Sequence, residues 1–252
     1  MYRMSRPSPS VMDSTIRRAS DNAMSMRGDK MVFVPSFPIR SARAEQAVPP
    51  GRVGFDLDAD VLLLHTIQAN AAVDELRKNG VLRPRPEHTA SEWPEAYAWM
   101  NRMMGERLPT SGSTAVWLWA QIRRDDLIRN CGRARGQVLL TCRIPRERVL
   151  LSQFDEWHSV LNSFPAIPIL PDESDAEYDA RYTALTDAFL VRREAGGHRN
   201  VPVSQWPADL RRDTELSWEC IFDREIFDRK AYWQATVHEL RADDVVDAVQ
   251  IL

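Results

Sequence analysis

The pattern of hydrophobic and polar positions changes near residue 60. Residues 1–59 are rich in Ser, Pro, Arg and Met, and they keep neither a helical nor an alternating period. A segment of this kind cannot bury enough apolar surface to offset the entropy lost when it is ordered. We therefore expect residues 1–59 to form a disordered arm, in which the apolar run Met31–Pro35 could add an edge strand.

Residues 60–252 carry the periods of regular elements. Short apolar runs, which are typical of buried strands, occupy 61–66, 114–120, 137–144, 232–239 and 248–251. Apolar positions at helical spacing predict helices over 70–79, 91–107, 154–162, 172–195 and 207–222. Because strands and helices are intermixed without a regular βαβ cadence, we expect a single mixed α+β domain over 60–252. Its sheet should be mostly antiparallel, with the helices at its periphery.

Composition excludes several classes of protein. No stretch approaches the ~20 consecutive apolar residues of a membrane span, and no secretory signal is visible, so we expect a cytoplasmic protein without a membrane partner. The three cysteines Cys131, Cys142 and Cys220 cannot pair completely and are typical of reduced thiols. The formal net charge is −3, so nucleic acid is not an expected partner. No dense cluster of His, Cys and carboxylate residues predicts a metal site.

The string from Ser152 to Asn162 is the most distinctive part of the chain. In a helix, Asp155, His158 and Asn162 lie at i, i+3 and i+7 and can form one polar row. A carboxylate beside a histidine raises the pKa of the imidazole, as a general base needs. The alternative is a capped helix with satisfied polar neighbours, in which Ser152 or Asp155 is the cap.

Three other places could carry chemistry. His65 and Thr66 end the first strand, and strand ends and the loops after them commonly present site residues. Glu219, in a Ser-Trp-Glu string, could act as an acid or base, although a lone helical glutamate is usually solvated. Residues 121–136 read as a polar loop whose five arginines could clamp phosphates, or could simply be solvated.

The chain from Leu62 to the C-terminus resembles an uncharacterised bacterial family, domain of unknown function 3841. The resemblance rests on these strings: Leu64–Gln68, Val138–Leu140, Ile144–Pro145, Val149–Ser152, Phe154–Asn162, Ser217–Asp223 and Gln234–Thr236. It covers about three quarters of the chain, and the Phe-Asp-x-Trp-His string is its most specific part. The family implies no function.

A remoter likeness concerns the layout of ADP-ribosyltransferases. In that layout a His or Arg of the first strand holds NAD, and a late-strand Glu orients the nucleophile. The likeness implies that His65, Thr66 and Gln68 hold a nucleotide such as NAD. Gln234 occupies the position that aligns with this late-strand Glu, so the usual carboxylate is missing. Glu219 or Glu239 could supply a carboxylate only if the fold brings one of them near Gln234. The alternative is a non-enzymatic module that binds a protein partner; hydrolysis by Asp155 and His158 is a third hypothesis.

Overall fold

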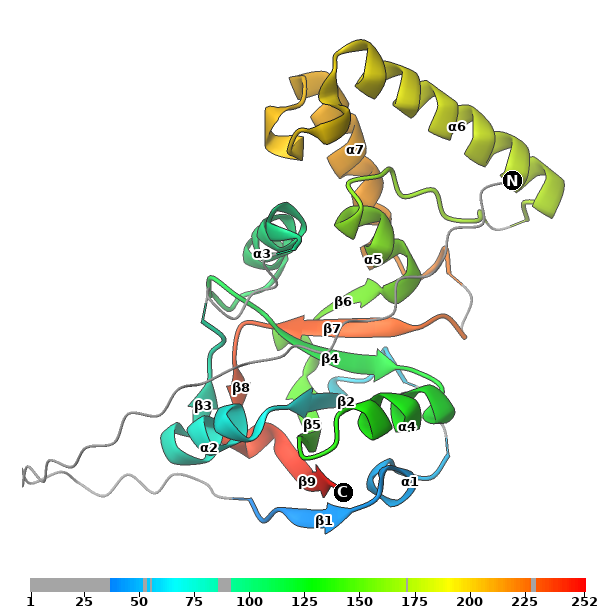
Figure 1. The fold of residues 1–252 in the computed structure, drawn as a ribbon. Coiled ribbons are helices and arrows are strands. Elements are labelled where there is room, and N and C mark those ends of the chain that lie inside the picture. The colour runs from blue at the N-terminus through cyan, green and yellow to red at the C-terminus, as the bar shows by residue number, and fades with distance from the viewer. Residues whose placement is uncertain (1–36, 52–53, 55, 86–91, 171, 228–229) are drawn as a thin grey trace, which may run out of the picture.

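The computed structural model describes residues 37–252, apart from 52–53, 55, 86–91, 171 and 228–229. Its main feature is a seven-stranded sheet in the order β1-β9-β5-β2-β4-β7-β6 (Figure 1). Only the β1–β9 pair in this sheet is parallel. The strands are β1 (Arg40–Ala42), β2 (Val61–Gln68), β4 (Val116–Gln121), β5 (Val138–Pro145), β6 (Leu150–Gln153), β7 (Trp233–Val237) and β9 (Val245–Ile251). The predicted α+β class with a mostly antiparallel sheet is confirmed.

The two faces of the sheet are covered by different helices, because successive side chains of a strand point to opposite faces. On one face, Leu62 and Leu64 of β2 pack in one cluster with Leu76 of α2 (Asn70–Asn79). On the other face, Ile67 and Leu139 pack with α4 (Arg124–Arg133) and α1 (Ala44–Ala47). The helices α2 and α4 therefore flank β2 and β5 (Figure 1).

A second group of helices gathers beside β6 and β7 (Figure 1). It consists of α3 (Pro94–Arg107), α5 (Phe154–Leu161), α6 (Asp175–Ala195) and α7 (Ala208–Trp218). Trp157 and Trp218 are both buried in this cluster, as expected from their places in amphipathic helices. The remaining elements are a two-stranded antiparallel sheet of β3 (Val81–Leu82) with β8 (Leu240–Arg241), and 3₁₀ turns at Arg146–Arg148, His198–Asn200, Val203–Gln205, Glu219–Phe222 and Ala242–Asp244.

The folded domain begins earlier than the sequence suggested. Strand β1 pairs with β9, and Ala44, Ala47 and Val48 are buried against α4 and β9. The expected boundary at residue 60 is therefore too late. This edge depends on pairing with a strand about 200 residues further along the chain, which local periodicity cannot reveal. The proposed edge strand at 31–35 lies outside the described residues.

Two further expectations fail for related reasons. The predicted polar loop 121–136 contains α4, which is anchored by Leu127 and Cys131, both fully buried and one helical turn apart. Two anchors among many charged residues give too weak a period to recognise. Leu216 is one of the apolar positions that predict the helix over 207–222, but it is 57% exposed and does not face the core.

Strands β2 and β4 separate where the site is built. Among the described residues they share one ladder pair, His65 with Trp119. Gly54 and residues 56–59 approach the gap between the first half of β2 and the end of β4, and Gly54 touches the β4 backbone. A Cβ at Gly54 would lie 1.5 Å from the carbonyl oxygen of Ala120, and its φ is +70°. Only glycine fits this position without displacing β4.

Candidate functional site

A row of six side chains crosses one face of the sheet. Residues directly opposite each other in an antiparallel ladder share a face, so the pairings of adjacent strands can be followed from β9 to β6. The members of this cross-strand row are Asp247, Thr141, His65, Trp119, Gln234 and Ser152. Five of the six side chains are polar and the sixth is an indole. A row of this composition in the middle of a sheet is unusual, because buried polar groups are costly unless they are satisfied.

His65 lies near the centre of the row. Its ring is 1% exposed, and Nδ1 is 3.1 Å from Thr141 Oγ1. Burial lowers the pKa of His65 to about 4, so the imidazole is neutral at pH 7. No described residue forms a hydrogen bond with Nε2. His65 therefore offers an uncharged ring nitrogen with hydrogen-bonding capacity to spare.

Gln234 and Ser152 end the row on the β6 side and are also under-satisfied. Ser152 is completely buried, and its Oγ has no partner among the protein atoms described. The same holds for Gln234 Oε1, which is directly across the ladder from Ser152. Two neighbouring oxygens without donors can accept hydrogen bonds from an NH group of a ligand or from an ordered water.

Aromatic rings line the row where β4 meets β7. The Trp119 ring is half-buried and lies 5.0 Å from the ring of Phe154 and 6.5 Å from that of Tyr232. His158 stacks edge-on against Phe154 at 4.7 Å. Trp117 contacts Trp157 on the same side. Trp117 and Trp119 lie two residues apart on β4, so both indoles are on the face that carries His65.

The two sides of the row along the sheet differ in exposure, and the side that carries Leu63 is the open one. Along the sheet, its neighbours on one side are the apolar positions Leu139, Ile67 and Trp117. On the other side, Leu63 is 42% exposed, and the exposed Arg143 lies opposite it in the ladder. Arg143 forms no hydrogen bond or ion pair with a described residue, so its guanidinium is available to an anion.

A cavity of about 170 Å³ lies where β2 and β4 separate. It is lined mainly by apolar side chains, which come from β2, the end of β4 and the segment before β2: Gly54, Asp56, Leu57, Ala59, Val61, Leu62, Leu63, Leu64 and Ala120. Pockets for drug-sized ligands measure roughly 300–1,000 Å³, so this space suits a single ring. Leu64 and Ala120 pack in the cluster on the α2 face, opposite to their chain neighbours His65 and Trp119, so the cavity does not continue the row.

The four predicted nucleotide-binding residues are divided between the two faces. His65 and Gln234 lie in the cross-strand row, two strands or roughly 10 Å apart. Thr66 and Gln68 face the opposite side. Thr66 Oγ1 donates to the carbonyl of Trp117 at 2.8 Å, and Gln68 Nε2 donates to Thr66 Oγ1 at 2.8 Å. These two side chains hold β2 beside β4 and do not join His65, because alternate residues of a strand diverge.

Neither alternative carboxylate reaches Gln234. Glu219 pairs with Arg107 at 2.7 Å, among the helices. Glu239 lies beyond the far end of β7, roughly 15 Å along the extended chain from Gln234. Although partial burial raises the pKa of Glu239, the guanidinium groups of Arg241 and Arg83 outweigh it and hold that pKa below its ordinary value. The structure therefore brings no carboxylate from these two positions to the row.

Asp155 and His158 do not form the predicted pair. His158 Nδ1 lies 2.9 Å from the Phe154 carbonyl, which can only accept, so Nδ1 carries the proton. The exposed Asp155 accepts from Gln153 Nε2 at 3.3 Å. The helix cap is Gln153, whose Oε1 accepts from the backbone of Glu156, and not Ser152 or Asp155. Local hydrogen bonds to the backbone compete successfully with the side-chain pair.

Three of the five arginines of the predicted loop already have partners within the protein. Arg123 and Arg129 both pair with Asp126, and Arg124 donates to the carbonyls of Glu45, Val48 and Pro49. Arg143 lies nearer the row and has no hydrogen-bond or ion-pair partner among the described residues. Sequence reasoning missed Arg143, Thr141, Trp119 and Ser152 as site residues, because only the strand register places them beside His65.

The chain belongs to the family described as Domain of unknown function (DUF3841), whose model matches residues 63–246. The predicted family is confirmed. The matched region contains every member of the cross-strand row except Asp247. No curated protein matches the chain, and no solved structure does. In the part of the chain that the structure describes, no helix is long and apolar enough to cross a membrane. The same residues contain no group of three or more His, Cys, Asp or Glu side chains that could hold a metal ion.

Proposed function

We propose that this domain binds a nicotinamide or adenine nucleotide, such as NAD, along the cross-strand row. The observation that carries the proposal is the combination in one row of a buried neutral histidine with spare hydrogen-bonding capacity and two buried oxygens without donors. Leaving buried oxygens without a hydrogen bond costs about 1–3 kcal/mol each. A ligand that donates to them recovers that cost.

The chemistry of the row fits the parts of a nucleotide. The half-buried Trp119 offers an aromatic surface, on which a base can stack. Gln234 Oε1 and Ser152 Oγ would accept from the carboxamide of nicotinamide or the amino group of adenine. Arg143, exposed on the open side, would pair with the phosphates.

The placement of His65 and Gln234 favours the ADP-ribosyltransferase-like layout over an unrelated arrangement. Both are on one face, and they come from the first long strand and from a late strand, as that layout requires. The departure is chemical. An amide has no basic oxygen that could take a proton from a nucleophile, and neither Glu219 nor Glu239 is at hand. The proposed activity is therefore nucleotide binding, with transfer weak or absent.

Isothermal titration of the full chain with NAD and with ADP-ribose tests the proposal. His65→Ala should weaken binding by about 1–3 kcal/mol, the scale of one lost hydrogen bond to a buried polar group. Gln68→Ala is the matched control, because it lies on the same strand with its side chain on the opposite face. Equal loss of affinity in both variants, or no binding of either ligand by the parent chain, would refute the nucleotide site.

The alternative is a module that binds another protein and no nucleotide. It is favoured by the exposed apolar side chains Ile169, Leu170 and Leu185, which lie away from the row. The alternative predicts that His65→Ala lowers stability and leaves partner binding intact. Melting temperature and nucleotide affinity, measured together on that single variant, distinguish the two functions.

A further inference from the structure

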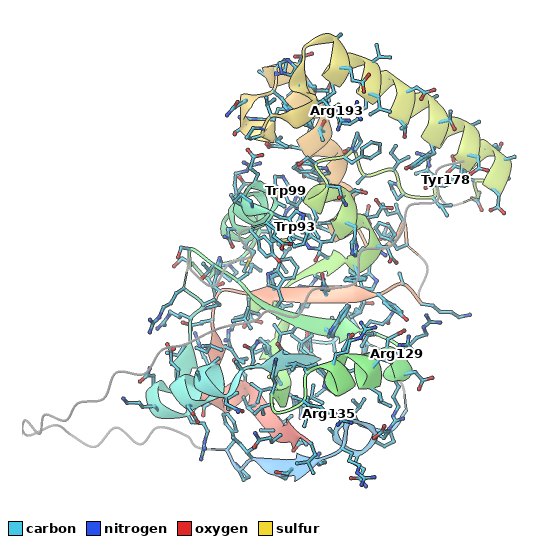
Figure 2. The ribbon with its side chains drawn as sticks, viewed as in Figure 1. Trp93, Trp99, Arg129, Arg135, Tyr178 and Arg193 are labelled. Atoms are coloured by element: carbon cyan, nitrogen blue, oxygen red, sulfur yellow. The ribbon has the colours of Figure 1, made fainter. Side chains whose placement is uncertain are left out.

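Helix α6 is longer than the surface it packs against. Its 21 residues span about 31 Å, yet Phe189 is its one buried side chain in the described structure. The Phe189 ring contacts Phe164 at 5.1 Å and Trp206 at 5.7 Å. Figure 2 shows Arg193 between α6 and α7, while Tyr178 lies toward the opposite end of the helix. The N-terminal half of α6 thus projects from the helical cluster.

The apolar stripe of α6 continues into this projecting half. Tyr178, Tyr182 and Leu185 precede Phe189 at spacings of four, three and four residues, so all four share a helix face. Tyr182 is 37% and Leu185 47% exposed, and the rings of Tyr178 and Tyr182 are 5.7 Å apart. The apolar stripe of an amphipathic helix usually faces the core along its whole length. In α6 only the C-terminal end of the stripe is buried, so the N-terminal end lacks a covering surface.

The segment before α6 extends the same surface. Ile169 and Leu170 are both exposed, and Arg181 of α6 holds the segment by donating to the Pro168 carbonyl at 2.7 Å. Arg181 also pairs with Glu173 at 2.6 Å. We call Ile169, Leu170, Tyr178, Tyr182 and Leu185 the α6 stripe.

The projecting half is built to stay helical without a cover. Ser174 and Glu177 form a capping box, in which each side chain bonds to the backbone of the other. The acidic residues of the first turn suit the positive end of the helix dipole. The surface is therefore formed before any partner arrives, which reduces the entropy cost of binding.

The charge around the stripe restricts the partner. Residues 171–190 contain six acidic side chains and one arginine. Asp175 and Asp179, which lie within about 100° of Tyr178 around the helix, are exposed and have no ion-pair partner among the described residues. An apolar stripe with an acidic border matches a basic amphipathic helix, whose apolar side would cover the stripe while its cations meet the carboxylates. We propose that the α6 stripe docks a basic amphipathic helix of a partner protein, independently of the nucleotide site.

Two other occupants fit less well. A second copy of the chain, paired two-fold through the stripe, would bring two acidic surfaces together. Residues 1–36 have a formal charge of +3, but their apolar positions do not repeat at helical spacing, so they do not supply an amphipathic face.

The test is fluorescence anisotropy of a labelled 18-residue model peptide of leucine and lysine in a helical i, i+3, i+4, i+7 pattern. The full chain should bind it, and a peptide with glutamate in place of lysine should not bind. Leu185→Glu should weaken binding about tenfold, the effect of losing one buried apolar anchor. Val191→Glu is the control, because Val191 is 67% exposed but lies about 180° around the helix from Tyr182. Both positions are exposed, so both variants should fold, which circular dichroism verifies.

Charge and competition complete the experiment. Asp175→Asn with Asp179→Asn should reduce the salt dependence of peptide binding, because two carboxylates no longer meet the lysines. Equal weakening by Leu185→Glu and Val191→Glu would overturn the proposal. So would a dimer in sedimentation velocity that Leu185→Glu abolishes, which would make a second copy the occupant. Peptide binding that appears only after deletion of residues 1–36 would instead assign the stripe to the chain's own N-terminal segment.

Discussion

Replacement of Asp244 should destabilise the domain more than any surface substitution. Arg148, in the turn between β5 and β6, makes two hydrogen bonds to the Asp244 carboxylate at 2.7 and 3.0 Å. The two side chains are only 10% and 6% exposed. Asp244 also accepts from the backbone of Arg241 at 2.8 Å. The pair therefore joins the β5–β6 connection to the turn before β9. Because both side chains are buried, water cannot solvate either charge if its partner is removed.

The expected magnitude follows from this burial. Asp244→Ala leaves the Arg148 guanidinium buried without its counter-charge, which typically costs 3–5 kcal/mol. Asp247→Ala is the matched control, because its pair with Arg40 is 2.7 Å long but 39–49% exposed. Exposed pairs contribute roughly 0–1 kcal/mol. The buried pair can also be replaced as a unit: Arg148→Met with Asp244→Leu should recover much of the loss.

Urea denaturation followed by far-ultraviolet circular dichroism measures these differences. With a slope of about 2–3 kcal/mol per molar urea, Asp244→Ala should lower the midpoint by about 1–2 M. Asp247→Ala should shift it by less than about 0.5 M. Equal midpoints for the two alanine variants would show that the buried pair of Arg148 and Asp244 contributes no more than an exposed pair. A double variant no more stable than Asp244→Ala would show that the unpaired Arg148 charge is not the source of the loss.

Three further predictions concern the edge, the site and the core. A chain that starts at residue 60 should melt at least about 5 °C below one that starts at residue 37, because β1 and α1 cover apolar surface of α4 and β9. Equal melting temperatures would show that the folded domain begins at residue 60. The pKa of His65 is about 4 when folded and about 6.5 when unfolded, so the unfolded chain binds the extra proton and His65 should remove about 3 kcal/mol of stability between pH 6.5 and 4. The His65→Asn variant should lack that component in parallel urea titrations, and identical pH profiles would argue against a buried neutral ring. Trp157→Ala should cost about 3–5 kcal/mol because the side chain is 3% exposed; a variant with the parent's urea midpoint would place Trp157 outside the core.

Much of the domain could be predicted from local pattern. The apolar runs at 61–66 and 137–144 became the central strands β2 and β5. The stop at Gly80 is real, since this residue caps α2 in the left-handed conformation with φ +75°. These features depend on residues near one another in the chain. Strand β1 forms by pairing with β9, and α4 buries only two side chains. Neither segment therefore shows a hydrophobic period in its own sequence.

The candidate site was predictable only in part for the same reason. His65 and Gln234 were identified as single residues, but their common row is a property of register across six strands. The likeness to the ADP-ribosyltransferase layout implies that Thr66 and Gln68 join His65, whereas the alternation of side chains along β2 places them on the other face. Helical spacing allowed Asp155 and His158 to meet, but it could not show that His158 would bond to the Phe154 carbonyl instead.

Long-range ¹H–¹⁵N NMR of the histidine rings, with and without NAD, measures both the protonation of His65 and its contact with the nucleotide. The His65 ring is assigned with the His65→Gln variant. We expect His65 to remain neutral at pH 6, because burial lowers its pKa to about 4. We also expect its Nε2 resonance to shift when NAD is added. His198 lies far from the row and should not respond. Protonation of His65 near pH 6.5, or a His65 resonance unchanged at an NAD concentration that saturates any observed binding, would contradict the nucleotide site.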